Sequence, residues 1–545
     1  MILLYNKNRL LTIRWHVDKL ILWYNQFAMA KTKIFILLSL IIALGFFLRV
    51  YNIENAPPGV YPDEAVNGMD AIDAMRGDWQ WFYPANNGRE GLFMNLIALC
   101  FKLFGISVLT LRLPSIIFGT LAILGIYLLA KELFRNPRIG LIAAFLASAS
   151  FWPINFSRIS FRANMLPAIL AFSFYFLFRG VRTKKKLDFA IGGLLFGAGL
   201  HTYISFRIAP LILAIMLLTL IISRKNFLKE YWKVISVFCV FAALAAAPML
   251  YTFFVSHPEY WQSRTSEISI LSPEVNQGNL SGTFFKSFSL SLLKYNFWGD
   301  QNWRHNLPPY PLLDPLTGIA FMFGLAYSFL KLLRLLALRF AKKIRDNKME
   351  TYAFLLSSFF IMLVPEFMTA EGNPHALRSI GTLPAVFIFS ALTLNYFFEY
   401  AEDQGSVFKK TIAAIFIIMV ITIGLSNAIK YHLVWANKPE TARAFDKNLI
   451  DISDYLKTLP LSGEKFVVVE TMERIPIQLF NYGQPGIEYV YPGQIDYLSP
   501  KNIDHFMVIL TDKNDEIISR LQSKFPGLNL EERKNSPETS FYTLD

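Results

Sequence analysis

Cysteine is scarce in this sequence, with two residues among 545, Cys100 and Cys239. Both lie in apolar segments, and their separation matches neither a metal-binding spacing nor an evident disulfide pair. The sequence therefore predicts no disulfide framework and no cysteine-based metal site.

Charge is also sparse. Charged residues make up 17% of the chain and hydrophobic residues 54%, and the mean hydropathy is +0.37. A soluble chain of this length would divide into several domains, each with a charged surface. This sequence instead repeats apolar runs of about twenty residues, the length that crosses a bilayer. It predicts a polytopic α-helical membrane protein, with no internal repeat and no low-complexity tract.

The apolar runs predict about eleven spans. They cover residues 34–51, 107–130, 139–156, 163–180, 189–203, 207–222, 233–255, 315–333, 351–369, 379–397 and 411–429. The run 92–105 is shorter and is typical of a helix at the membrane surface or half-way into it. Residues 1–28 suit an amphipathic cytoplasmic helix, although Met29 is an alternative start, and we expect the first span to be an uncleaved anchor.

The net charge of +13 does not indicate nucleic-acid binding, because the basic residues form short clusters between the spans. If the N-terminus is inside, 27 of the 53 Lys and Arg residues fall in interior segments. These segments are 1–33, 131–138, 179–187, 224–233, 331–348 and 409–410. The positive-inside rule then places the N-terminus in the cytoplasm and the C-terminus outside the cytoplasmic membrane. The segments 52–91, 256–314 and 370–378 are exterior in this topology.

Residues 431–545 differ from the rest. Segments 464–470 and 505–511 have the pattern of buried strands, and 440–458 and 514–524 the pattern of helices. We therefore expect three parts: a cytoplasmic segment 1–33, a membrane domain 34–430 and a small exterior α/β domain 431–545.

The exterior segment 52–91 carries adjacent carboxylates, Asp63 and Glu64, directly after Tyr61-Pro62. Acids held beside a membrane are costly and suggest function. A carboxylate here could act as general base on a hydroxyl group, although both acids could instead be ordinary solvated loop residues. Glu90 is a further candidate, with capping of a helix that begins at Leu92 as its alternative role.

Arginine and histidine residues recur at the predicted exterior ends of spans. They are Arg158, Arg162, His201, Arg207, Arg304, His305, His375 and Arg378. A single such arginine often extends to lipid headgroups. Their recurrence on four hairpins favours instead a site for phosphate, which arginine matches through paired donors. Acids and phosphate-binding bases at one surface suggest transfer from a phosphorylated lipid, with arginine stabilising the leaving phosphate.

Several motifs follow the acidic loop in a characteristic order. They are Leu-Phe-Met-Asn to Phe-Lys-Leu-Phe-Gly (92–105), Leu-Arg-Leu-Pro-Ser (111–115), Lys-Glu-Leu-Phe (131–134), Phe-Ser-Arg to Arg-Ala-Asn (156–164), and the segments 302–318 and 374–381. With these motifs the chain resembles the GT-C membrane glycosyltransferases, in particular the bacterial branch related to protein O-mannosyltransferases and the lipid A aminoarabinose transferase.

The resemblance implies an inverting transfer of one sugar from a polyprenyl-phosphate donor to an acceptor hydroxyl at the outer face. Asp63 would be the base, and Glu64 would support it. This chain departs from many relatives at Arg89-Glu90-Gly91, where they have His-Pro-Pro. The paired-aspartate metal pattern of oligosaccharyltransferases is not evident, so we expect neither a metal nor another cofactor.

The acceptor stays open among a protein, lipid A, a cell-wall polymer and another lipid. A transporter or flippase of a lipid-linked or anionic substrate is the alternative function. Transporters, however, place ionisable groups near the bilayer midplane and often consist of repeated halves. A scaffold role is a third possibility for the C-terminal segment alone.

Overall fold

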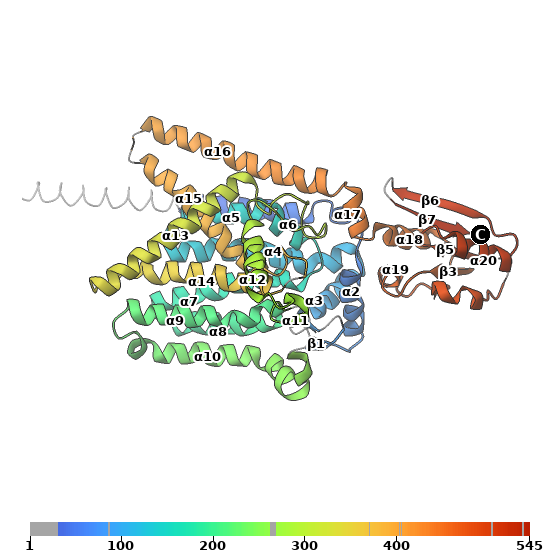
Figure 1. Cartoon of the computed structure of the whole chain (residues 1–545), viewed down its shortest axis with the longest axis horizontal. Helices are drawn as coiled ribbons and strands as arrows, with labels where there is room; N and C mark the ends of the chain where they lie inside the picture. Colours follow the sequence, from blue (N-terminus) through green and yellow to red (C-terminus); the bar gives the residue numbers. More distant parts are fainter. Residues whose placement is uncertain are drawn as a thin grey trace, which may run out of the picture.

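The computed structural model describes residues 31–545 except 86–87, 262–268, 370, 403, 405, 503–504 and 537–538. The expected cytoplasmic helix 1–28 and the alternative start at Met29 lie outside the described residues. The described chain forms a long helical bundle with an α/β domain at one end (Figure 1).

Nine helices in this part of the chain are long and apolar enough to cross a membrane. They are Lys31–Val50, Val108–Phe134, Arg162–Thr183, Ile204–Ser223, Phe227–Ser256, Pro315–Ala341, Lys348–Phe367, Ile380–Ala401 and Lys410–Trp435. After the first, their α-helical parts are α4 (Val108–Phe134), α7 (Met165–Thr183), α9 (Pro210–Ser223), α10 (Phe227–Tyr251), α13 (Pro315–Ala341), α14 (Lys348–Phe367), α15 (Leu383–Glu402) and α16 (Ser406–Ile429). The predicted polytopic helical class is confirmed.

Two of the eleven predicted spans differ from simple crossing helices. The run 139–156 is two helices, α5 (Pro137–Ala149) and α6 (Phe151–Ser157), which meet at 60° and raise the count to ten if they are one span. The run 189–203 is the 13-residue helix α8 (Lys186–Ala198) followed by a 3-10 turn. Hydropathy responds to apolar residues in a turn as it does to those in a helix, so it overestimated this span.

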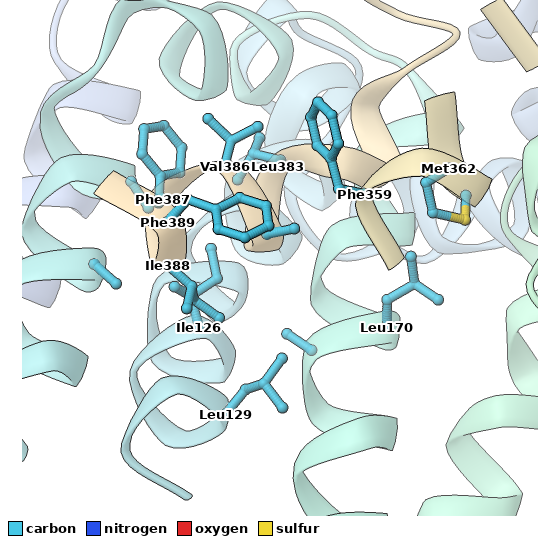
Figure 2. Packing of buried hydrophobic residues seen from close by; sticks show 14 of the residues in the cluster. Ile126, Leu129, Leu170, Phe359, Met362, Leu383, Val386, Phe387, Ile388 and Phe389 are labelled. Atoms are coloured by element: carbon cyan, nitrogen blue, oxygen red, sulfur yellow. The ribbon is translucent and has the colours of Figure 1, made fainter. Parts of the chain in front are cut away.

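The centre of the bundle is a layer of buried apolar side chains (Figure 2). Ile126 and Leu129 of α4 lie near Leu170 of α7, and Phe359 of α14 faces Phe389 of α15. Helices α10 and α16 lie at the edge of the bundle in Figure 1, and few of their residues are buried. Close packing of the central helices provides a rigid frame for the loops at both ends.

The connections rich in Lys and Arg, between α7 and α8, α9 and α10, and α13 and α14, all lie at the end of the bundle far from the α/β domain (Figure 1). This arrangement agrees with the clustering that the sequence analysis used. Which end faces the cytoplasm stays a prediction.

The segment 52–91 is more ordered than the polar loop that we expected. It contains α2 (Pro62–Met75) and a short antiparallel hairpin of β1 (Phe82–Tyr83) and β2 (Arg89–Glu90). Pro62 occupies the start of α2, where its missing N–H costs nothing, and two acids follow in the first turn. The next helix, α3 (Leu92–Phe104), is the short apolar helix expected from the sequence.

The connection between α10 and α13 contains α11 (Pro273–Asn276) and α12 (Leu280–Leu293) and continues without regular structure to Asp314. Only its described residues enter the argument below.

The C-terminal domain has the expected α/β composition. Its helices are α17 (Pro439–Ala444), α18 (Lys447–Thr458), α19 (Arg474–Phe480) and α20 (Asp515–Lys524), and its strands are β3 (Glu464–Val468), β4 (Ile487–Val490), β5 (Phe506–Leu510), β6 (Leu530–Ser536) and β7 (Thr539–Leu544). The sheet order is β4-β3-β5-β7-β6, parallel in its first three strands and antiparallel in the rest. Both strands predicted at 464–470 and 505–511 are present.

The domain boundary lies a few residues later than expected. The last span continues beyond α16 through a π-helical turn, Lys430–Trp435, in which Tyr431 and Trp435 are buried against Phe151. The polar residues Lys430 and His432 in this turn gave the sequence pattern of a helix end. The C-terminal α/β domain therefore begins after Trp435.

Candidate active site

The acids of α2 face different surroundings. Glu64 is completely buried and forms a paired contact with Arg112 of α4, with Nε–Oε2 and Nη2–Oε1 distances both 3.0 Å. The Ser160 N–H donates to Glu64 Oε2 at 2.7 Å. With these three donors the buried carboxylate is fully satisfied, so Glu64 has a positioning role.

Arg112 also holds the chain that leads into α2. Its Nη1 donates to the carbonyl oxygens of Ile53 and Pro57, and its Nη2 donates to that of Gly59 at 2.6 Å. A guanidinium with five N–H donors can satisfy several acceptors at once. The segment 53–64 is thereby tied to the start of α4. The sequence analysis did not single out Arg112, although it lies within the Leu-Arg-Leu-Pro-Ser motif.

Asp63 precedes Glu64 in the first turn of α2 and is partly exposed. Burial lowers the pKa of Arg89 and raises that of Tyr61, and the nearby charge of Asp63 acts to raise the pKa of both groups. Successive helix positions point in different directions, so one acid is locked in the interior while its neighbour lies at the surface of the site. Asp63 is therefore the more accessible of the two predicted acids.

Arg304, in the connection between α12 and α13, contacts Tyr61, which lies two residues before this acid. Its guanidinium lies 4.7 Å from the centre of the Tyr61 ring. Among the residues that the structure describes, this guanidinium has neither a hydrogen bond nor an ion pair. Tyr61 is buried between Phe161 and Phe445, and burial raises the pKa of its hydroxyl well above the usual value. Arg304 is thus a cation near Tyr61, two residues before Asp63, and no described residue accepts a hydrogen bond from its guanidinium.

Arg158 is a buried anchor for the backbone. It donates to the carbonyl oxygens of Leu48 and Ala56 and lies over the ring of Tyr431. Its donors already have acceptors in the protein, and no part of its side chain is exposed. Arg158 is therefore not available as a phosphate ligand, contrary to the prediction from sequence. The prediction was wrong because the sequence pattern of an arginine at a span end is the same whether its side chain binds backbone or a ligand.

Glu90 pairs with Arg162, with an Nε–Oε2 distance of 2.6 Å, and both are buried. Arg162 also lies over the ring of Tyr203. This ion pair gives Glu90 a role other than capping α3 and joins β2 to the turn before α7. Glu90 is therefore at the site but is occupied by a cation of the protein.

His201 and Arg207 lie on the Glu90 side of the site. His201 Nε2 is 2.9 Å from the Ala245 carbonyl oxygen, and its ring meets the edge of Trp81. Arg207 donates to the Trp261 carbonyl oxygen at 2.7 Å and lies against the rings of Phe253 and Trp261. The tertiary structure thus brings Glu90, Arg162, His201 and Arg207 into one group, as the sequence analysis expected of the exterior bases.

Arg89 and Asp70 form a further pair that the sequence analysis missed, 2.6 Å apart. Arg89 also donates to Asn67 at 2.8 Å, and Asn67 donates to the Ser160 carbonyl oxygen. Burial raises the pKa of Asp70 to about 6 against the opposing effect of Arg89. Helical spacing of Asn67 and Asp70 on one face of α2 was the available signal.

His305 and His375 come together from two exterior connections, with ring centres 4.7 Å apart. His305 Nδ1 is 2.9 Å from Asp300 Oδ2. Arg378 lies farther along the second connection, where it donates to the Glu371 carboxylate and to the Thr369 hydroxyl. Arg378 is thus engaged by an acid of its own loop.

A cavity at the opposite end of the bundle contains none of these residues. It has a volume of about 770 Å³ and is lined by Glu132, Arg182, Arg224, Glu350 and neighbouring side chains at the far end of the bundle. Its arginines are already paired, Arg182 with Glu132 and Arg224 with Glu350. Because none of the predicted site residues lines it, we assign it no part in the chemistry.

The fold is that of known GT-C enzymes. ArnT from Cupriavidus metallidurans, in a crystal structure bound to undecaprenyl phosphate, matches with a TM-score of 0.53 and 12% identity over 94% of this chain and 98% of that one. The oligosaccharyltransferase of Archaeoglobus fulgidus, tethered to an acceptor peptide, matches with a TM-score of 0.52 and 15% identity over 92% of this chain and 69% of that one.

Within this fold, residues 92–251 match the model of the dolichyl-phosphate-mannose-protein mannosyltransferase family. No curated protein matches the chain by sequence. The resemblance to GT-C glycosyltransferases that the sequence motifs indicated is thereby confirmed. Family model and fold together support glycosyltransferase activity.

Proposed function

We propose that this protein transfers a sugar, with inversion, from a polyprenyl-phosphate donor to an acceptor hydroxyl. The reaction takes place at the outer face of the cytoplasmic membrane, with Asp63 as general base. The observation that carries the proposal is the contrast within one helical turn. Glu64 is locked by Arg112, whereas Asp63 is held at the same rigid position and remains accessible. A base needs such fixed geometry together with access to the substrate.

In the proposed step, the acceptor oxygen attacks the anomeric carbon while Asp63 takes the hydroxyl proton. The bond between the anomeric carbon and the phosphate oxygen breaks, and the polyprenyl phosphate leaves with its electron pair. The negative charge that grows on the phosphate requires a nearby cation.

Arg304 is our candidate for that cation. Its guanidinium lies 4.7 Å from the centre of the Tyr61 ring and forms no ion pair among the described residues, and its charge opposes the effect of burial on the pKa of Asp446. Arg162 and Arg378 are paired with Glu90 and Glu371. The proposal therefore assigns first contact with the donor phosphate to Arg304, and gives Arg162, His201, Arg207 and Arg378 supporting positions.

The structural neighbours are consistent with this donor class and leave the acceptor open. ArnT was crystallised with undecaprenyl phosphate and the archaeal oligosaccharyltransferase with an acceptor peptide. The α/β domain packs over α2, with Leu479 of α19 against Gly68. We propose that the acceptor enters between this domain and the membrane surface, as a protein, lipid A, a cell-wall polymer or another lipid.

The deciding experiment is a transfer assay with purified protein, labelled polyprenyl-phosphate sugars and a membrane extract as acceptor pool. Asp63→Asn should lower the rate by about 10²–10⁴-fold, the usual contribution of a general base. Asp73→Asn is the matched control, since Asp73 is an exposed acid of the same helix. The control should retain the wild-type rate.

Arg304→Ala in the same assay should raise the donor KM or lower kcat, whereas an effect on the acceptor alone would place the donor elsewhere. Equal rates for Asp63→Asn and wild type would refute the base assignment. If wild type moves no label from any donor, the assay turns to lipid flipping, which the transporter alternative predicts.

A further inference from the structure

Asp300, His305 and His375 place three metal-ligating side chains together outside the Asp63 region. One ligand atom from each lies within 4.8 Å of the other two. Asp300 and His305 belong to the connection before α13, and His375 belongs to the connection before α15. The cluster therefore joins two exterior segments that are 70 residues apart between His305 and His375 in the sequence.

The geometry of the cluster is close to that of a metal site. Ligand atoms about 2.1 Å from a tetrahedral zinc ion lie about 3.3 Å from one another. The His305 Nδ1–Asp300 Oδ2 distance of 2.9 Å is near this value. A small outward movement of these two atoms would admit an ion in place of the shared proton.

The ligands are also held in place by neighbouring groups. Asp300 Oδ2 accepts from the Ala376 N–H at 2.7 Å and Oδ1 accepts from the Asn302 N–H at 2.8 Å. The His305 ring packs against Phe156, and the His375 N–H donates to the buried Glu366 carboxylate at 3.0 Å. Such outer contacts orient ligands and tune affinity in known metal sites.

We propose that Asp300, His305 and His375 bind a divalent transition-metal ion of the zinc type, a site beyond the proposed glycosyl transfer. Two imidazole nitrogens and one carboxylate suit zinc and its neighbours, whereas Ca²⁺ and Mg²⁺ prefer oxygen ligands alone. This reverses our expectation from sequence that no metal is bound. The spacing of the histidines, on separate connections, could not reveal the site.

The ion would act as a clamp between the two exterior connections. Arg304 directly precedes His305, and its carbonyl oxygen accepts from Asn155 at 2.8 Å. Fixing His305 to His375 would hold Arg304 against Tyr61. Three protein ligands would leave a fourth position for water or a substrate oxygen.

The test measures zinc binding by the whole chain in detergent. The protein is purified through an affinity tag that contains no histidine, and EDTA removes any bound metal beforehand. Wild type should bind one tight Zn²⁺ per chain by titration calorimetry and by elemental analysis after desalting. His375→Gln and Asp300→Asn should each raise the Kd for Zn²⁺ by more than about 100-fold. Loss of an outer-shell contact costs up to about 100-fold in affinity, and loss of a direct ligand should cost more.

Two controls keep the result specific. His257→Gln removes an exposed histidine of the same exterior connection and should leave zinc binding intact. Asp63→Asn should also retain the ion, which separates this site from the proposed catalytic base. Because binding is read without any transfer reaction, failure of the proposed function would not alter the outcome.

Thermal unfolding guards against a variant that fails to fold. Metal-free His375→Gln should unfold at nearly the same Tm as metal-free wild type, and only wild type should gain Tm on addition of zinc. Wild type without tight zinc would show a hydrogen-bonded His-Asp pair and overturn the proposal. So would zinc that is lost in Asp63→Asn but kept in His375→Gln.

Discussion

Neighbouring residues of one helical turn have separate roles in this protein. Asp63 and Glu64 are indistinguishable as sequence, yet Arg112 engages only Glu64. The reason is geometric, because Glu64 is buried against Arg112 of α4 whereas the neighbouring Asp63 is partly exposed. The pair shows why adjacent acids in a motif need not share a function.

We expect Glu64→Gln to lower the free energy of unfolding by about 3–5 kcal/mol, the usual cost of breaking one partner out of a buried pair. Arg112 would stay buried without a countercharge, although the glutamine has the same shape. Unfolding followed by tryptophan fluorescence in detergent measures the change.

Glu230→Gln is the matched control, since Glu230 pairs with Lys184 in an exposed position. Solvent screens such a pair, and we expect no measurable loss. If both substitutions cost the same, the pair of Glu64 with Arg112 does not stabilise the fold as described.

Asp446 lies at the junction of the two domains and makes the stability of the protein depend on pH. Burial, more than the charge of Glu473, raises its pKa from 3.8 to about 6, with Arg304 opposing. A carboxyl whose folded pKa is raised contributes stability that is fully present below pH 3.8 and is lost as the pH rises through about 6. Wild-type stability should therefore fall over this window.

Asp446→Asn should flatten this fall and give the higher Tm at pH 7, with the difference vanishing near pH 4. Asparagine tolerates the left-handed backbone at this position, where φ is 48°. Asp70 and Glu473 have raised pKa values too, so some slope should remain. An unchanged Tm profile between pH 4 and 8 would contradict the assignment.

At the scale of elements, the α/β domain sits against the segment that carries Asp63. Gly59 has φ +83°, and a Cβ there would lie 2.3 Å from the Phe445 carbonyl oxygen. Trp435 donates to the carbonyl oxygens of Trp303 and Asn306, which joins the same junction to the Arg304 connection. The domain, through Phe445, and the end of the last span, through Trp435, thus hold the two segments beside the candidate site.

Gly59→Ala should therefore destabilise the protein more than Gly105→Ala. Gly105 has a similar φ, +81°, with open space around it, so its substitution reports backbone strain alone, about 1–2 kcal/mol. Differential scanning calorimetry in detergent compares the two variants. Equal losses of stability in the two variants would mean that the α/β domain does not pack closely against the segment that carries Asp63.

The elements were predictable from sequence where periodicity is long and unbroken. The central spans and the strands β3 and β5 follow directly from hydropathy and alternation. The bend between α5 and α6, the short α8 and the helical character of α2 did not, because a local pattern carries no record of how a segment packs.

For the whole molecule, the predicted orientation can be tested by labelling. With Cys100 and Cys239 replaced by alanine, Tyr497→Cys in the C-terminal domain should react with a membrane-impermeant maleimide in intact cells. Lys185→Cys, in the connection between α7 and α8, should react only after permeabilisation. The predicted outward position of the α/β domain requires this difference, and the reverse pattern would invert the topology.

The predicted site residues were scattered over the exterior ends of the spans, and the bundle sorts them into local groups. Glu90, Arg162, His201 and Arg207 form one group, and His305, which directly follows Arg304, lies against His375 in another. Arg158 binds backbone and is not part of the site, whereas Arg112, which was not predicted, holds Glu64 in place. The sequence indicated at which ends of the spans the candidate residues lie, but it could not show which side chains each of them contacts.

The amino-acid sequence by itself determined that the chain is a polytopic membrane protein with an α/β domain at its end, because bilayer thickness and residue alternation act locally along the chain. It also marked the acidic segment of Asp63. Only the tertiary structure decided which acid is locked by Arg112 and which arginine lies over the ring of Tyr61. Pairing of buried charges depends on contacts between residues distant in sequence, such as Glu64 and Arg112, and no local pattern specifies them.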